Sequence, residues 1–200
     1  MGKELNKEFY DSVFEYGGSE EMYFKDYKET SWFPVWSKII DTISDGNFKN
    51  VLDIGCGPGQ FANQLIDTLP EIKYTGLDFS YIARDQAIKR VPSFNFIVAD
   101  ALKFDFNSLE YDVVVSTEFL EHVVQDKNIL QSLKSGVLIL ATLPNMDSEG
   151  HVRFLSKDVD SARSEILNHY GDICEILEIT YHHYENTEDN GDYLIKMVLR

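Results

Sequence analysis

The chain has 200 residues, 44% of them hydrophobic and 13% aromatic, which predicts one globular domain with a substantial buried core. No run of about 18 apolar residues is present, so we expect no membrane partner. The 34 acidic and 18 basic side chains give a net charge of −16, a field that repels phosphate backbones and disfavours nucleic acid as a partner. Two cysteines and an N-terminus without a secretory signal predict a cytoplasmic protein.

Residues 1–30 are rich in aromatic and acidic side chains, interrupted by glycines at positions 17 and 18. So many aromatic side chains need burial, so we expect two short helices on either side of the glycines. This segment is predicted to be a helical cover on a single compact domain formed by residues 31–200. A lid over a substrate pocket is a second, compatible interpretation. The first helix of the domain is predicted to begin with Ser31 as its cap and Pro34 in its first turn.

Residues 51–61 predict a short buried strand, a glycine turn and the start of a helix. The alternating glycines let the backbone approach a ligand without a Cβ in the way. The turn ends at a helix N-terminus, where free N–H groups favour negatively charged ligand groups. A dinucleotide fingerprint requires a third glycine or an alanine where this chain has Gln60, which weighs against a nicotinamide or flavin site.

The spacing Asp53-x-Gly55-x-Gly57-x-Gly59 resembles motif I of the class I S-adenosylmethionine-dependent methyltransferases. In that family the glycine turn, which here includes Cys56, holds the methionine moiety of the cofactor. The acid at the position of Asp53 orients that moiety, often through water. The resemblance therefore implies that these five residues bind S-adenosylmethionine.

The second and third predicted strands end in acids, Asp78 and Asp100. Asp78 is placed to accept hydrogen bonds from both ribose hydroxyls of a nucleoside, and Phe79 to stack beside its base. Alternatively, Asp78 caps the next helix together with Ser80. The resemblance implies that Asp100 accepts a hydrogen bond from the adenine amino group, and that the backbone N–H of Ala101 meets the ring.

Strands and helices alternate along the rest of the chain, with strands predicted at 111–116, 136–142, 174–184 and 192–200, and a helix at 156–170. A polar turn joins the last two strands into a hairpin, so the final strand is predicted to run antiparallel to the others. The resemblance covers about residues 32–200. It implies an α/β, Rossmann-like fold, with a seven-stranded, mostly parallel sheet, one antiparallel strand near an edge, and helices on both faces.

Glu118, Glu121 and His122 follow the fourth strand and Thr117, which we assign to the cofactor site. On a helix, their spacing would place the three side chains on one face. The pattern Glu-x-x-Glu-His resembles the ubiquinone-biosynthesis O-methyltransferases and the small-RNA terminal 2′-O-methyltransferases. In the second group this pattern, with a later histidine, holds a divalent metal. His151 is a candidate for that later histidine.

Three roles for these four residues stay open from the sequence. They hold a divalent metal that activates a hydroxyl group. Alternatively, His122 or His151 acts directly as a general base. In a purely structural role, Glu118 stabilises a helix N-terminus and His122 is a packed side chain. We favour the metal-free general base and assign no metal ligands.

The sequence thus predicts methyl transfer from S-adenosylmethionine to a small-molecule acceptor. Oxygen is the preferred acceptor atom, because a hydroxyl group needs its proton removed and the chain offers bases for that step. Two alternatives remain, a metal-assisted RNA 2′-O-methyltransferase and a non-catalytic regulatory domain that binds S-adenosylmethionine. The sequence does not identify the acceptor or the oligomeric state.

Overall fold

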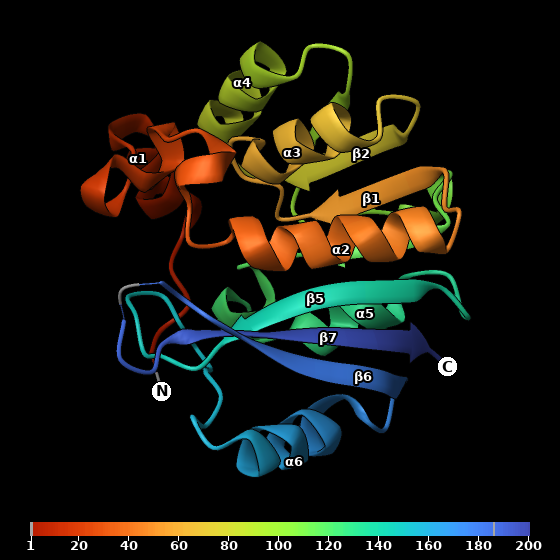
Figure 1. Ribbon diagram of the computed structural model, residues 1–200. Helices are drawn as coiled ribbons and strands as arrows, with labels where there is room; N and C mark the ends of the chain where they lie inside the picture. Colours follow the sequence, from red (N-terminus) through yellow and green to blue (C-terminus); the bar gives the residue numbers. More distant parts are fainter. Residues whose placement is uncertain (1, 186) are drawn as a thin grey trace.

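The computed structural model describes residues 2–185 and 187–200 (Figure 1). Within these residues, seven strands form one sheet in the order β3-β2-β1-β4-β5-β7-β6. β7 pairs antiparallel with β5 and β6, whereas the other neighbouring strands pair in parallel. The predicted sheet is therefore confirmed. The strands are β1 Asn50–Ile54, β2 Lys73–Asp78, β3 Asn95–Val98, β4 Val113–Ser116, β5 Leu138–Pro144, β6 Cys174–His183 and β7 Gly191–Leu199.

Helices cover both faces of the sheet, as predicted (Figure 1). The buried strand β4 shows why: Val113 and Val115 join the apolar cluster under α2 and α3, whereas Val114 joins the cluster under α5 and α6. Apolar side chains on both faces are typical of a parallel strand buried between two helical layers. The helices are α1 Lys7–Tyr16, η1 Ser19–Phe24, η2 Tyr27–Glu29, α2 Phe33–Asp45, α3 Gln60–Thr68, α4 Tyr81–Arg90, η3 Phe106–Ser108, η4 Leu120–His122, α5 Asp126–Gln131 and α6 Val159–Tyr170.

Two local predictions are wrong. α2 begins at Phe33 and no side chain caps it, so Ser31 is not its cap. Glu118, Glu121 and His122 do not share a helix, because only the short 3₁₀ turn η4 forms there. The Glu118 N–H donates to Thr142 Oγ1 of β5 at 3.0 Å, and Glu118 adopts a φ of 52°. A residue bonded to the neighbouring strand in this left-handed conformation cannot begin an α-helix.

The N-terminal segment lies across the carboxyl ends of the parallel strands (Figure 1). α1 and η1 flank the two glycines, as predicted. Hydrogen bonds tie the segment to α3 and α4: Gln60 Nε2 donates to the carbonyls of Met22 and Lys25, and Arg90 donates to that of Tyr23. None of the helices in the described part of the chain combines the length and apolarity needed to span a bilayer.

Candidate functional site

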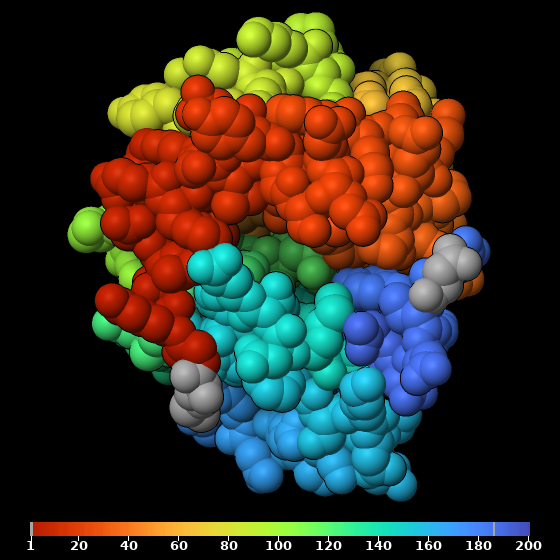
Figure 2. All heavy atoms as spheres, turned by 90° about the vertical axis from the view of Figure 1, so that its left-hand side faces the viewer, coloured from red at the N-terminus to blue at the C-terminus, as the bar shows by residue number. Residues whose placement is uncertain are grey.

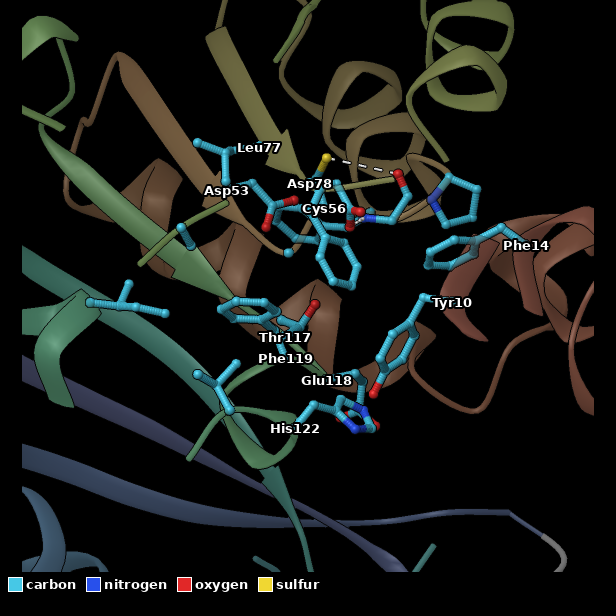
Figure 3. Close-up of a pocket in the computed structure, with 18 of the residues that line it drawn as sticks. Tyr10, Phe14, Asp53, Cys56, Leu77, Asp78, Thr117, Glu118, Phe119 and His122 are labelled. Carbon is cyan, nitrogen blue, oxygen red and sulfur yellow. Dashed lines mark hydrogen bonds between the residues drawn. The ribbon is translucent and has the colours of Figure 1, made fainter. Parts of the chain in front are cut away.

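A pocket lies at the carboxyl ends of β1, β2 and β4, under the N-terminal segment. Figure 2 shows a hollow on this side of the molecule, between the N-terminal segment in red and the stretch after β5 in cyan. Phe14 of α1 faces the glycine turn, whereas Tyr10 points toward Glu118 and His122 on the other side of the pocket (Figure 3). Every residue predicted to bind the cofactor, except Gly59, lines this pocket.

The glycine turn is held against β2 by two hydrogen bonds, from the N–H groups of Gly55 and Cys56 to the Leu77 carbonyl. A side chain at Gly55 would collide with the Phe119 ring, so this glycine permits close packing. At Gly57 a Cβ would meet only ring atoms of Phe14, at 3.7 and 3.8 Å. Gly57 therefore has an open face toward the pocket, where a ligand would fit against the backbone.

Asp53 is 1% exposed and has one carboxylate oxygen without a partner. Its Oδ2 accepts a 2.6 Å hydrogen bond from the Tyr74 hydroxyl, while Oδ1 is buried and unpartnered. Burial raises the pKa of Asp53 to about 7, against the opposing effect of the Tyr74 hydrogen bond. A buried carboxylate oxygen without a donor fits a ligand that brings one, such as an ammonium group.

Asp78 links the glycine turn to the start of α4. Its carboxylate accepts hydrogen bonds from the N–H groups of Gly57, at 3.0 Å, and Ser80, at 2.8 Å. The Ser80 side chain itself caps α4 by accepting from the Ala83 N–H. Burial raises the pKa of Asp78 to about 6, while the two backbone donors oppose that shift. Each carboxylate oxygen has a second lone pair, so Asp78 still has acceptor capacity for a ligand.

The remaining predicted cofactor residues surround the same pocket. Phe79 packs beside Tyr10, with ring centroids 5.6 Å apart. Ala101 and Thr117 are buried. Asp100 is half-exposed and pairs with Lys103 at 2.6 Å, so a ligand that takes its carboxylate competes with a surface lysine.

Three of the four predicted catalytic residues meet beside this pocket. Ligand atoms of Glu121, His122 and His151 all lie within 4.8 Å of one another. Glu118 stands apart from them, with its carboxylate accepting a 3.0 Å hydrogen bond from the Thr142 hydroxyl. The sequence therefore predicted that these residues lie near one another, but not that Glu118 lies apart from the other three.

Backbone carbonyls fix the tautomers of both histidines. His122 Nδ1 lies 3.1 Å from the Gly150 carbonyl, and His151 Nδ1 lies 3.0 Å from the Met146 carbonyl. A carbonyl oxygen only accepts, so each Nδ1 carries the hydrogen and each Nε2 keeps a lone pair. Burial, and secondarily His151, lowers the pKa of His122 to about 4, so this imidazole is neutral at physiological pH.

Glu121 is fully buried, and neither of its carboxylate oxygens has a partner. Burial raises the pKa of this carboxyl well above its usual range, and Glu118 adds to the effect. Its Oε1 lies 3.7 Å from the lone-pair nitrogen Nε2 of His122. The Glu121 carboxylate and the Nε2 lone pairs of the two histidines are all electron-rich, and within the described residues no positive charge lies between them. A shared proton or a divalent cation would supply that charge.

Two contributors to the site had no signal in the sequence. Asp192, at the start of β7, is fully buried beside Glu118 and accepts a hydrogen bond from the Tyr184 hydroxyl at 2.6 Å. Arg153 pairs with Asp126 at 2.9 Å, and it also donates to the carbonyl of Val123, directly after η4. Only the strand order and the path of the loop after β5 bring Asp192 beside Glu118 and Arg153 beside η4.

Comparisons with known proteins agree with this geometry. Residues 51–140 match the family model described as "Methyltransferase domain". The chain is 30% identical over 109 residues to a trans-aconitate 2-methyltransferase of Rhodopseudomonas palustris (strain BisA53), which is 52% of this chain and 42% of that protein. It is 31% identical over 130 residues to a ubiquinone biosynthesis O-methyltransferase of Shewanella halifaxensis, 60% of this chain and 54% of that protein. The chain thus spans about half the length of the curated relatives it matches.

Among solved structures, the N-methyltransferase NodS from Bradyrhizobium japonicum, in complex with S-adenosylhomocysteine, is similar with a TM-score of 0.66. The match has 17% sequence identity and covers 84% of this chain and 87% of that one. The chain shares the fold of this solved methyltransferase, and its residues 51–140 match a methyltransferase domain. Both findings agree with the resemblance to the class I methyltransferases inferred from the glycine turn.

Proposed function

We propose that the protein transfers the methyl group of S-adenosylmethionine to a small-molecule acceptor. The observation that carries this proposal is the unpartnered, buried Oδ1 of Asp53, beside the open face of Gly57 at the carboxyl edge of the sheet. Ligands of open α/β sheets bind at that edge. A structural neighbour bound to S-adenosylhomocysteine, and relatives named as methyltransferases, support the same donor.

The residues present fit this donor along its length. Asp53 Oδ1 accepts a hydrogen bond from the ammonium group of the methionine moiety, and Gly57 leaves room for that moiety. Asp78 uses its remaining lone pairs for the ribose hydroxyls. Phe79 and Ala101 bracket the adenine ring. When bound, the donor supplies an electrophilic methyl carbon on a sulfonium sulfur, and the protein aligns the acceptor behind it.

We further propose oxygen as the acceptor atom. The Tyr10 hydroxyl is buried without a partner, and its ring lies 5.5 Å from that of His122 between centroids. A hydroxyl acceptor would find a hydrogen-bond partner in Tyr10 and a base in the Glu121–His122 pair. An imidazole with a pKa of about 4 is a weak base alone, so Glu121, with its raised pKa, takes the larger share of the proton.

A divalent cation at Glu121, His122 and His151 is the second candidate mechanism, favoured by the convergence of their ligand atoms. A carboxylate and two imidazoles suit a first-row transition metal better than Mg²⁺. Such an ion would polarise the acceptor hydroxyl and replace the general base. Methylation of RNA at this site is less favoured, because a net charge of −16 opposes the approach of a phosphate backbone.

Calorimetric titration with S-adenosylhomocysteine tests the donor assignment. Asp78→Ala is expected to lose about 1.5–3 kcal/mol of binding free energy, the scale of hydrogen bonds to charged groups, and Asp78→Asn less. NAD serves as the control ligand and is expected not to bind. The proposal is contradicted if the wild-type protein does not bind S-adenosylhomocysteine, or binds NAD equally well.

A further inference from the structure

The pocket wall is acidic, and within the described residues no lysine or arginine lines it. Five carboxyl groups do: Glu4, Asp53, Asp78, Asp100 and Glu118. The single histidine in the wall is His122, whose Nδ1 is hydrogen-bonded to the Gly150 carbonyl. The described part of the pocket wall therefore offers no lysine or arginine to an acceptor.

Two arginines near the pocket are engaged elsewhere, and the exposed Lys103 is paired with Asp100. Arg153 is paired with the buried carboxylate of Asp126. Arg90 donates to the carbonyls of Pro58 and Tyr23. These groups are fixed by the fold, so turning one into the pocket would break contacts that hold the wall together.

Aromatic rings form the rest of the acceptor side. Tyr23, Trp32 and Trp36 make a continuous row, with ring centroids 6.0 and 5.5 Å apart. Tyr10 and Phe119 complete the wall beside His122. Such rings contact flat apolar bodies well, and their faces attract cations but not anions.

We propose that the acceptor carries no carboxylate or phosphate group, and is an uncharged or ammonium-bearing molecule with a flat apolar body. An anion buried here would lose its hydration without gaining a counter-ion. The ammonium group of the donor pairs with Asp53 and not with Glu4 or Glu118. These two carboxyl groups therefore remain on the acceptor side, where they repel an anion further. The inference rests on the proposed methyl transfer, and it separates this chain from the trans-aconitate relatives, whose named acceptor is a tricarboxylate.

Three para-substituted phenols of similar size, whose side chains end in a neutral, a cationic and an anionic group, test the proposal: 4-ethylphenol, tyramine and 4-hydroxyphenylacetate. With methyl-labelled S-adenosylmethionine, the uncharged and ammonium-bearing phenols are expected to exceed the carboxylate in kcat/KM by at least about tenfold. A pooled metabolite extract, labelled in the same way and separated by anion exchange, extends the test beyond phenols. Labelled products that elute as anions, or preferred methylation of 4-hydroxyphenylacetate or trans-aconitate, would overturn the proposal.

A variant that reverses one charge tests whether the pocket wall is what discriminates against anionic acceptors. Glu4 lies in the pocket wall, whereas Glu8 is an exposed acid on α1 outside it. Glu4→Lys is expected to raise the carboxylate-to-neutral kcat/KM ratio about fivefold or more, and Glu8→Lys to leave it unchanged. Equal ratios in the two variants would contradict a charge barrier at this wall. Calorimetry with S-adenosylhomocysteine on the wild type distinguishes failure of this inference from failure of the proposed methyl transfer. If the protein binds S-adenosylhomocysteine but prefers anionic acceptors, only this inference is contradicted.

Discussion

The Tyr74 hydroxyl donates a 2.6 Å hydrogen bond to one oxygen of Asp53, and the other oxygen of this buried carboxyl has no partner. Burial raises the pKa of Asp53 to about 7, so the group is half ionised near neutral pH. The charge of Asp53 therefore depends on what donates to its second oxygen. A cationic ligand group would hold the carboxylate ionised, and lowering the pH would weaken that ligand.

The first prediction concerns the pH dependence of S-adenosylhomocysteine affinity. Affinity is expected to rise from pH 6 to pH 8, because the folded-state pKa values of Asp53 and Asp78 are about 7 and 6 and both must be ionised to bind. Tyr74→Phe removes the hydrogen bond that lowers the pKa of Asp53, so the rise should move to higher pH. Calorimetry across this range measures it, with Tyr111→Phe as a buried-tyrosine control. A flat profile contradicts ionisation of Asp53 on binding.

The second prediction concerns stability without ligand. A carboxyl whose folded-state pKa is raised from 3.8 to about 7 binds protons more tightly when folded, so the unfolding free energy falls as pH rises through this window. At pH 8, Asp53→Asn removes the buried charge and is expected to raise the unfolding free energy by about 1–3 kcal/mol. The same variant should lose affinity for S-adenosylhomocysteine. Urea unfolding at pH 8 and pH 5 checks the first part, and the gain should be clearly smaller at pH 5, where Asp53 is protonated in the folded protein.

The third prediction compares two glycines with positive φ. Gly57 has φ +50° and faces the pocket, whereas Gly136 has φ +80° and nothing within 4 Å of a Cβ. Replacing either by alanine costs about 1–2 kcal/mol of stability, from the left-handed backbone. Gly57→Ala alone should also weaken S-adenosylhomocysteine binding, at least tenfold, because its methyl group takes the space of the ligand. Equal affinity in the two variants would remove the glycine turn from the site.

The fourth prediction separates the two mechanisms at Glu121, His122 and His151. For a general base, Glu121→Gln should lower kcat by about 10²- to 10⁴-fold, and a chelator should have no effect. For a metal site, the chelator abolishes activity, added divalent ion restores it, and His151→Ala fails as completely as Glu121→Gln. Metal analysis of the purified protein and turnover with and without chelator decide between them. Full activity of Glu121→Gln would exclude both roles for this carboxyl.

The limb of the pH–rate profile follows from the same cluster. From the sequence, a histidine base predicts a limb near the ordinary imidazole pKa of about 6.5. Burial moves the pKa of His122 to about 4, so activity that depends on neutral His122 should not fall between pH 8 and pH 6. A fall in that range that persists in Tyr74→Phe would point to Glu121, whose pKa is raised.

The fifth prediction concerns the N-terminal cover, residues 1–30. Its residues Tyr10 and Phe14, both on α1, line the pocket. Amides of α1 are expected to exchange more slowly when S-adenosylhomocysteine is bound, because the ligand contacts these rings. Amides of β5, in the centre of the sheet, are the internal control and should not change. Equal exchange of α1 in both states would make the segment a structural cover without a lid function.

Local patterns were enough to predict the glycine turn and the helix cap beside the pocket. Gly57, Asp78 and Ser80 lie at or just after the end of a buried strand, so each feature depends on residues that are neighbours in the sequence. The acceptor half depends on contacts between distant segments. Glu118 was misassigned to a helix because its backbone bonds to Thr142, and Asp192 was missed because only the insertion of β7 beside β5 brings it there.

Unpaired side chains were the other feature that the sequence could not reveal. Asp53 and Glu121 were both recognised as candidates, but nothing in their neighbours along the chain shows that their carboxylate oxygens lack donors. That property depends on how many polar groups from other elements reach the same point. It also sets the pKa shifts, which arise mainly from burial by residues far away in the chain.

The position of β7 between β5 and β6 has a consequence for the order of assembly. β5 is synthesised well before the strand that completes its hydrogen bonding, and β6, although made earlier than β7, reaches the sheet only through it. During synthesis on the ribosome, the five parallel strands β1 to β5 and the glycine turn are all made before β7. At that stage one edge of β5 has no hydrogen-bonded neighbour. Because Asp192 opens β7, the buried carboxyl beside Glu118 is added only at the end of this sequence. A nascent chain is therefore expected to acquire affinity for the methyl donor before it acquires a finished acceptor pocket.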